Sequence, residues 1–193
     1  MLDSLQPPTL FHIYLKNTKT GFSTMRLLFL IFIITGFIGM QTKADTDLKL
    51  TLETTAGNIE ISLLPELAPN HVARISELAE TGFYDGIIFH RVIPGFMAQT
   101  GDPDGNGMGG SGQKLKAEFS DYSYREGTVG MARASNPDSA DSQFFICYDG
   151  CSHLTGQYTV WGQVSDGMDN VYKISAGEPP IEPDRIISAS ISE

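Results

Sequence analysis

The chain has 193 residues, of which 23 are acidic and 13 are basic, and its formal net charge is −10 at pH 7. A surface this acidic repels nucleic acid and anionic lipid, so neither is an expected partner. We interpret the acidity as a source of solubility rather than as the mark of a specific cationic partner.

Residues 25–44 have the layout of a secretory signal peptide. The segment MRLLFLIFIITGFIGM, residues 25–40, carries one charge, Arg26, and the sequence TKA ends at Ala44. A short basic start, an apolar run of this length and small residues after it are features of a cleaved signal. A membrane-spanning helix needs about 20 apolar residues, so the run is short for a permanent anchor. We expect export and cleavage after Ala44; the alternative is an uncleaved anchor, which would be the only membrane contact.

Residues 1–24 stand awkwardly in front of this signal. A signal peptide begins within a few residues of its apolar run, whereas MLDSLQPPTLFHIYLKNTKTGFST intervenes here and shows no clear periodicity. We expect translation to start at Met25, which makes 1–24 a non-native or unstructured extension. The alternative is a long basic leader that uses Lys16 and Lys19.

The remaining residues, 45–193, have the length of one domain and contain no repeat or linker. Apolar and polar residues alternate over 48–52 and 59–63, and the turn sequence at 56–58 predicts a hairpin. Helical spacing of apolar residues predicts a helix from Pro69 to Gly82. Further short strands are predicted at 87–93, 96–100, 128–132, 143–147, 159–164 and 185–191, with a second helix near 168–175. Many short strands and few helices indicate a mostly β fold that closes into a barrel.

Two cysteines, Cys147 and Cys151, are the only ones in the chain. Export would place both in an oxidising compartment, where they could close a small loop at a strand end. Two cysteines without matching histidines make a poor zinc site. Because Cys147 follows the apolar residues FFI, we favour a buried core residue at this position. A disulfide with Cys151 is the alternative.

The segment FHRVIPGFMAQTGDPDGNGMGG, residues 89–110, sets one cation, Arg91, beside an apolar run and ahead of a glycine-rich stretch. On a largely buried surface the five rigid donors of an arginine are strengthened by desolvation. One interpretation makes Arg91 an electrophilic group at the rim of an apolar pocket. The other makes it a strand residue that reaches outward to a surface carboxylate.

A second segment, GTVGMARASNPDSADSQFFICYDGCSHLTGQYTVWGQV at residues 127–164, favours the first interpretation. Together the two segments closely resemble the cyclophilin family of peptidyl-prolyl cis–trans isomerases. The matching blocks are FHRVIPGFMAQTGD, NGMGG, MARA, SQFFI and HLTGQYTVWGQV, which follow the family order over about half of the domain. Five ordered blocks are far more specific than one short motif.

The resemblance implies the family's fold, a closed eight-stranded antiparallel β-barrel capped by two α-helices. It also implies an enzyme that accelerates X-Pro bond rotation in unfolded or newly exported polypeptides, with no cofactor and no metal. Combined with the signal peptide, it leads us to expect an exported monomer in a bacterial periplasm.

The resemblance assigns roles to individual residues. Arg91 is implied to donate towards the prolyl nitrogen, and Gln99 to hold the substrate or to steady Arg91. The implied proline pocket consists of Phe96, Met97, Phe145 and Leu154, with Gln143 on the neighbouring wall. The other implied substrate-binding residues are Gly107, Ala132, Arg133, Ala134, His153 and Tyr158. Phe89 and Phe144, on the opposite phase of their strands, are expected in the barrel core.

Three residues depart from the pattern of the best-studied eukaryotic members. Arg133 stands in place of an asparagine; the implied contact there is mainly through the backbone, so the arginine is compatible with binding and adds a charge near the substrate. His153 replaces the tryptophan at the pocket edge, and Tyr158 replaces a histidine. These replacements resemble bacterial members, and they predict weak cyclosporin binding rather than loss of catalysis.

Other functions have weaker support. Residues 102–107, DPDGNG, copy the start of a calcium-binding EF-hand loop, but its twelfth position is Gln113 instead of glutamate, so calcium is not expected. A hydrolase built on Ser142 or Cys147 has no recognisable base nearby in the sequence, and His90 is interpreted as a structural strand residue. The remaining alternative is a proline-peptide-binding chaperone module with little turnover, although such a module would not need Arg91.

Overall fold

Residues 48–193 are the part of the chain that the computed structural model describes. The extension assigned to 1–24 and the signal peptide assigned to 25–44 lie outside these residues. Between residues 48 and 193, no helix combines the length and the apolar character needed to cross a membrane.

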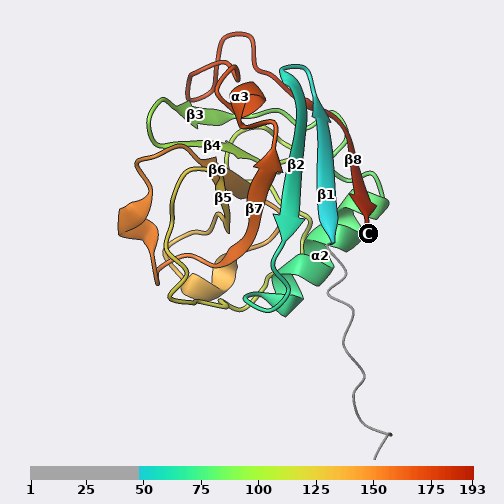
Figure 1. The fold of residues 1–193 in the computed structure, drawn as a ribbon. Coiled ribbons are helices and arrows are strands. Elements are labelled where there is room, and N and C mark those ends of the chain that lie inside the picture. The colour runs from blue at the N-terminus through green and yellow to red at the C-terminus, as the bar shows by residue number, and fades with distance from the viewer. Residues whose placement is uncertain (1–47) are drawn as a thin grey trace, which may run out of the picture. The chain divides into compact units, whose positions relative to one another are not determined.

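The period-two alternation of apolar residues builds one antiparallel sheet (Figure 1). Leu50 of the first strand faces Ile61 of the second, and Leu52 faces Ile59, so that the predicted hairpin buries all four side chains. The strands are β1 (Lys49–Thr54), β2 (Gly57–Leu63), β3 (Arg91–Ile93), β4 (Met97–Thr100), β5 (Thr128–Met131), β6 (Phe144–Cys147), β7 (Val160–Asp166) and β8 (Ile186–Ser192). Their spatial order is β3-β4-β6-β5-β7-β2-β1-β8.

The sheet is curled but open, so the expected closed barrel is wrong. Its two edges are β3 and β8, and a single isolated bridge, Ile88 to Arg185, joins the segments that precede them. Next to this bridge the Phe89 N–H donates to the carbonyl of Asp184 over 2.8 Å. The strand expected at 87–93 therefore begins only at Arg91, because the residues before it are held by this short contact instead of a continuous ladder.

Helix α2 (Pro69–Glu80) confirms the predicted first helix and packs beside β8 (Figure 1). Pro69 occupies its first turn, where a missing N–H costs nothing, and Gly82 follows its end with a left-handed φ of 71°. Helix α3 (Met168–Val171) is shorter than the predicted 168–175. Just beyond it, the Ser175 N–H donates to the carboxylate of Asp184 over 2.8 Å instead of continuing the helical pattern.

Two apolar clusters lie on opposite sides of β6, because successive side chains of a strand point to opposite faces. Phe144 belongs to the larger cluster, the core, where its ring packs edge-to-face on Tyr84 and Trp161 at 5.5 Å and 5.3 Å between centroids. Phe89 is buried in the same core, as expected for both residues. Phe145 belongs to the smaller cluster with Met97 and other apolar residues.

The smaller cluster also contains a disulfide between Cys147 and Cys151. The interpretation of Cys147 as an unpaired core residue is therefore wrong, although both cysteines are fully buried. The chain reverses direction after β6 and brings the two Cα atoms to 6.0 Å, a separation that a disulfide spans. This bond ties the end of β6 to the short 3-10 turn Ser152–Leu154.

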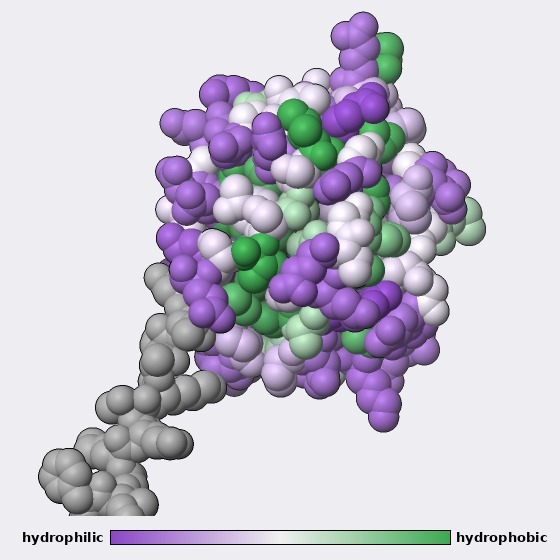
Figure 2. Space-filling model, turned by 90° about the vertical axis from the view of Figure 1, so that its right-hand side faces the viewer, coloured by the Kyte–Doolittle hydropathy of each residue, from purple (hydrophilic) through white to green (hydrophobic). Residues whose placement is uncertain are grey.

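One face of the molecule carries mostly hydrophilic side chains (Figure 2). On the face drawn in Figure 2, hydrophilic side chains surround small, separate apolar areas. Scattered apolar residues of this kind are normal on protein surfaces.

Candidate active site

A cavity of about 150 Å³ opens beside strands β4 and β6, with apolar side chains on one part of its lining and Arg91, Gln99 and Arg133 on the rest. Met97 and Phe145, its most deeply buried apolar residues, are only 2% and 4% exposed, and they come from neighbouring strands. Leu154 joins them from the turn that the disulfide holds. The lining residues are Arg91, Phe96, Met97, Gln99, Ala132, Arg133, Phe145, Leu154 and Tyr158.

Arg91 sits on the rim of this cavity. It lies on edge strand β3 directly opposite Gln99 of β4, and its side chain is 38% exposed. Its Nε donates to a carboxylate oxygen of Glu178 over 2.8 Å, while its Nη1 lies 3.8 Å from the sulfur of Met97. Arg91 is thus both a rim group and the partner of a surface carboxylate, which combines the two interpretations drawn from the sequence.

Two glutamines form a short hydrogen-bonded chain next to Arg91. Gln99 donates through Nε2 to Gln143 over 2.9 Å, and Gln143 donates through Nε2 to the carbonyl of Gly109 over 2.9 Å. Gln99 also lies opposite Arg91 on the paired strand, so both of its implied roles, holding substrate and steadying Arg91, stay predictions.

A second cavity of about 370 Å³ continues the first, because both are lined by Gln99, Ala132 and Arg133. Its other lining residues are Gly107, Met108, Gly109, Lys114, Ala134, Ser139, Asp141 and Gln143. Together the two cavities form a groove beside strands β3, β4 and β6. An extended peptide with its proline in the smaller cavity can therefore place a neighbouring side chain in the larger one.

Asp102 shapes the glycine-rich wall of the larger cavity. Its fully buried carboxylate accepts hydrogen bonds from the N–H groups of Asp104 and Asn106 at 2.9 Å and 3.0 Å, and from Gly107. Burial alone would raise the pKa of Asp102, but these backbone donors outweigh burial and hold the pKa below its ordinary value. In the segment that resembles a calcium loop, the Asp102 carboxylate therefore accepts hydrogen bonds from the loop's own backbone N–H groups.

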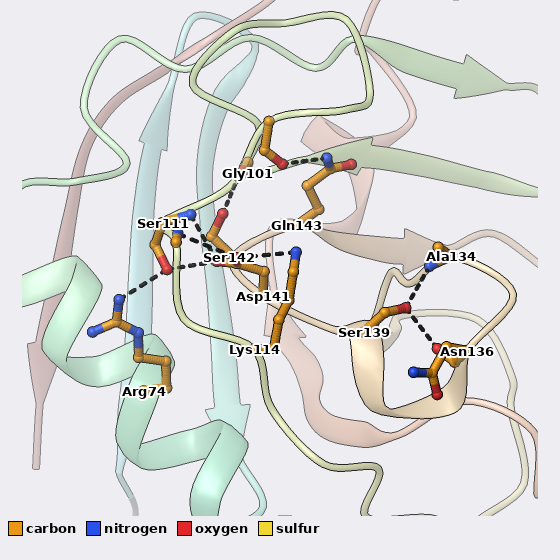
Figure 3. Close-up of polar contacts among 12 residues, drawn as sticks. Arg74, Gly101, Ser111, Lys114, Ala134, Asn136, Ser139, Asp141, Ser142 and Gln143 are labelled. Carbon is orange, nitrogen blue, oxygen red and sulfur yellow. Dashed lines mark hydrogen bonds and ion pairs between the residues drawn. The ribbon is translucent and has the colours of Figure 1, made fainter.

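Asp141 also lines the larger cavity and is only 5% exposed. Its carboxylate accepts from the N–H groups of Ser111 and Gly112 at 2.7 Å and 3.2 Å and pairs with Lys114 at 3.2 Å. Figure 3 shows how Arg74 of α2 extends this network through the Ser111 hydroxyl. Burial would raise the pKa of Asp141, but the Ser111 hydrogen bonds and Lys114 outweigh burial and lower the pKa.

Arg133 forms the ridge between the two cavities. Its guanidinium lies 4.4 Å from the ring centroid of Tyr158, and it donates to the carbonyls of Gln157 and Ala134 at 2.9 Å and 3.0 Å. No carboxylate within residues 48–193 forms an ion pair with it. The ridge therefore carries a positive charge that the described residues leave unneutralised.

Residues 49–191 match the family model described as "Cyclophilin type peptidyl-prolyl cis-trans isomerase/CLD". The chain belongs to the cyclophilin family. The match covers nearly all of the residues that form the sheet, the helices and the groove.

Cyclophilin relatives agree in sequence and in fold. A Brucella suis protein named "Probable peptidyl-prolyl cis-trans isomerase" is 47% identical over 173 residues, which are 81% of this chain and 88% of that protein. Peptidyl-prolyl cis-trans isomerase B of Bacillus subtilis is 44% identical over 122 residues, covering 62% of this chain and 85% of its own. With relatives this similar, the activity of the chain is peptidyl-prolyl cis–trans isomerisation.

Two solved structures resemble this cyclophilin. A cyclophilin from Hirschia baltica has a TM-score of 0.68 at 31% identity, covering 75% of this chain and 74% of that one. A cyclophilin-type isomerase of Cryptosporidium parvum, solved in the presence of the dipeptide Ala-Pro, has a TM-score of 0.70 at 30% identity, covering 75% and 99%.

The residues that departed from the eukaryotic cyclophilin pattern all lie at the groove. The His153 ring stacks on Phe96, with 5.5 Å between ring centroids and 27° between planes, which places it at the edge of the smaller cavity. Tyr158 meets Phe145 edge-on at 5.8 Å. The residues implied to contact substrate line the two cavities, except His153, which stacks on Phe96 beside the smaller one.

Several groove residues were missed by sequence reasoning. Met108 and Gly109 lie inside the recognised NGMGG block, so the block itself was their signal. Lys114, Asp141 and Glu178 had no such signal, because they reach the groove through contacts between distant segments.

His90 is buried, as expected of a structural residue, but neither ring nitrogen has a hydrogen-bond partner among the described residues. Burial lowers its pKa from the ordinary value, and the nearby Asp102 opposes that shift. The ring borders a cavity of about 280 Å³ that also touches Arg91 and Glu178.

Proposed function

We propose that this isomerase acts on X-Pro bonds in unfolded or newly exported proteins, with Arg91 as its catalytic residue. The observation that carries the proposal is the position of the guanidinium at the rim of a cavity with Met97 and Phe145 in its apolar lining. A proline ring is apolar and compact, and it occupies this cavity while the peptide bond before it lies beside Arg91.

Rotation about an X-Pro bond breaks no covalent bond but requires the loss of amide resonance, with a barrier of about 20 kcal/mol. An acceleration of roughly 10²- to 10⁵-fold corresponds to about 3 to 7 kcal/mol of transition-state stabilisation. As the amide twists, the lone pair on the prolyl nitrogen becomes an acceptor. A donor aimed at that nitrogen therefore binds the twisted state better than either planar state.

The remaining groove residues would hold the peptide during this rotation. The buried walls at Met97 and Phe145 exclude water, which strengthens the hydrogen bond from Arg91. Gln99 and Gln143 present amide groups along the groove, and Arg133 adds a positive charge between its two cavities. The peptide backbone passes over Ala132 and Ala134, and flanking side chains extend past Gly107.

The site of action that we propose is a bacterial periplasm, reached as a monomer after removal of residues 1–44. The signal-like sequence over 25–44 supports export. The disulfide between Cys147 and Cys151 also supports it, because such bonds persist in oxidising compartments.

The test is a protease-coupled assay on a proline peptide with the full-length protein and its Arg91→Ala variant. Loss of one preorganised donor should lower kcat/KM by about 10²- to 10³-fold. The melting temperature should change little, because Arg91 is partly exposed and lies on an edge strand. Full activity in a folded R91A variant would refute the role of Arg91, and peptide binding without acceleration by the parent protein would favour the chaperone-module alternative.

A further inference from the structure

Glu178 is fixed beside Arg91 by an unusual turn. Gly177 exchanges two backbone hydrogen bonds with Val92, at 2.8 Å and 3.0 Å, so the turn is pinned to edge strand β3. Gly177 has a φ of 150°, and a Cβ there would lie 2.6 Å from the Cα of Pro180. Only glycine suits this position, and its pairing with Val92 places the next residue, Glu178, next to Arg91.

The contact between Glu178 and Arg91 uses one particular nitrogen. Oε2 of Glu178 accepts from Nε of Arg91 over 2.8 Å, at the stem of the guanidinium. An arginine has five N–H donors, so this contact leaves the four terminal ones available to other partners. One terminal nitrogen, Nη1, lies 3.8 Å from the sulfur of Met97 at the smaller cavity. The carboxylate thus binds the guanidinium at Nε while the terminal nitrogens face the cavity.

Gln99, for which the resemblance implied either holding the substrate or steadying Arg91, donates to Gln143. We propose that Glu178 is the positioning residue of the isomerase reaction, a role that rests on the proposed function of Arg91. It preorganises the guanidinium before the substrate arrives, so less side-chain freedom is lost as the amide twists. It also balances the charge of Arg91, which lowers the cost of holding that charge beside apolar side chains.

The expected effect is modest because both side chains are partly exposed, 38% for Arg91 and 54% for Glu178. Ion pairs of this exposure couple weakly in solvent, so we expect Glu178→Ala to lower kcat by about two- to fivefold. KM should change less, because the apolar lining that binds the proline ring is untouched. Glu178→Gln keeps an oxygen that can accept from Nε and should recover most of the lost kcat.

The decisive experiment is a double-mutant cycle in the full-length protein with Arg91→Ala, Glu178→Ala and the double variant. Positioning predicts that E178A lowers kcat in the parent but has no effect on the residual activity of R91A. The matched control is Glu182→Ala, which removes an exposed carboxylate from the same loop and should leave kcat unchanged. Side-chain NMR should show faster solvent exchange of the Arg91 Nε–H in E178A and no change in E182A.

The outcomes distinguish the positioning role of Glu178 from the proposed catalytic role of Arg91. If R91A loses activity while E178A keeps the parent kcat, positioning by Glu178 is refuted and the role of Arg91 stands. An equal effect of E178A in the parent and in R91A, or an unchanged Nε–H exchange rate, also refutes it. Full activity of R91A refutes both proposals together.

Discussion

Replacing Asp141 by asparagine tests whether the wall of the larger cavity depends on one buried carboxylate. Asp141 is 5% exposed and accepts hydrogen bonds from Ser111 and Gly112, and it pairs with Lys114. An asparagine side chain keeps nearly the same shape, but its NH2 group would face donors that require an acceptor. The substitution therefore removes a charge and leaves without its acceptor at least one N–H group that now donates to Asp141; Ser111 is partly buried and Gly112 is exposed.

The magnitude follows from these contacts. Hydrogen bonds to a charged group contribute about 1.5 to 3 kcal/mol, and a donor left without its acceptor adds a smaller cost here because water reaches it in part. The Lys114 side chain is 62% exposed, so its ion pair adds little. We expect Asp141→Asn to lower the free energy of unfolding by about 2 to 4 kcal/mol, which corresponds to roughly 6 to 12 °C in Tm. KM should rise for peptides long enough to reach the larger cavity.

The pH dependence gives a second measure of the same carboxylate. Its pKa is lower in the folded protein than the ordinary value of 3.8, so ionised Asp141 stabilises the fold above that value. This contribution is lost as the pH falls through the lower folded-state pKa. The stability difference between the parent and D141N should therefore be constant near neutral pH and shrink below about pH 4.

Thermal melts and urea titrations of the full-length protein from pH 3 to pH 7 provide the measurement. Asp138→Asn is the matched control, since Asp138 is exposed, lies in the same segment and accepts one backbone hydrogen bond, from Ala117 at 2.9 Å. A Tm loss in D141N no greater than in D138N would refute the reasoning about the wall.

Two further predictions concern the pocket edge and processing. Cyclosporin should inhibit the parent weakly and the His153→Trp variant much more strongly, because indole adds apolar area and a ring N–H. His153→Phe adds apolar area without the N–H and so separates the two effects. Equal, tight inhibition of the parent and H153W would show that His153 does not lie at the pocket edge. Mass spectrometry of protein from a secreting host should show an amino terminus at Asp45, whereas a full-length, membrane-extracted product would establish an anchor.

Local patterns predicted the parts of the fold that depend on neighbouring residues. Period-two alternation located the β1–β2 hairpin, and Pro69 with Gly82 bounded helix α2. The errors arose where distant segments meet. The closed barrel failed because short contacts around Ile88 and Arg185, rather than a continuous ladder, join the segments at the two edges, and α3 ends at Val171, short of the residue 175 predicted. No spacing rule within one segment reports such contacts.

The candidate site follows the same division. Ordered sequence blocks supplied the residues from Arg91 to Tyr158 because each block folds as a local unit of the groove wall. Glu178 lies 87 residues from Arg91 in the chain, and only the pairing of Gly177 with Val92 brings it near. The disulfide was missed for a related reason, since the spacing of Cys147 and Cys151 suits either a turn or an unpaired buried residue.

Strand β6 explains how so small a sheet serves both stability and binding. Phe144 faces the core and is fully buried, while Phe145, the next residue, lines the smaller cavity. Because the two faces are independent, a change on the groove side need not disturb the packing around Trp161. The groove side lacks a large core of its own, so its geometry rests on specific ties: the Cys147–Cys151 bond, the carboxylates of Asp102 and Asp141, and the Arg91–Glu178 pair. Substitutions at these ties should therefore affect binding and turnover well before they unfold the core.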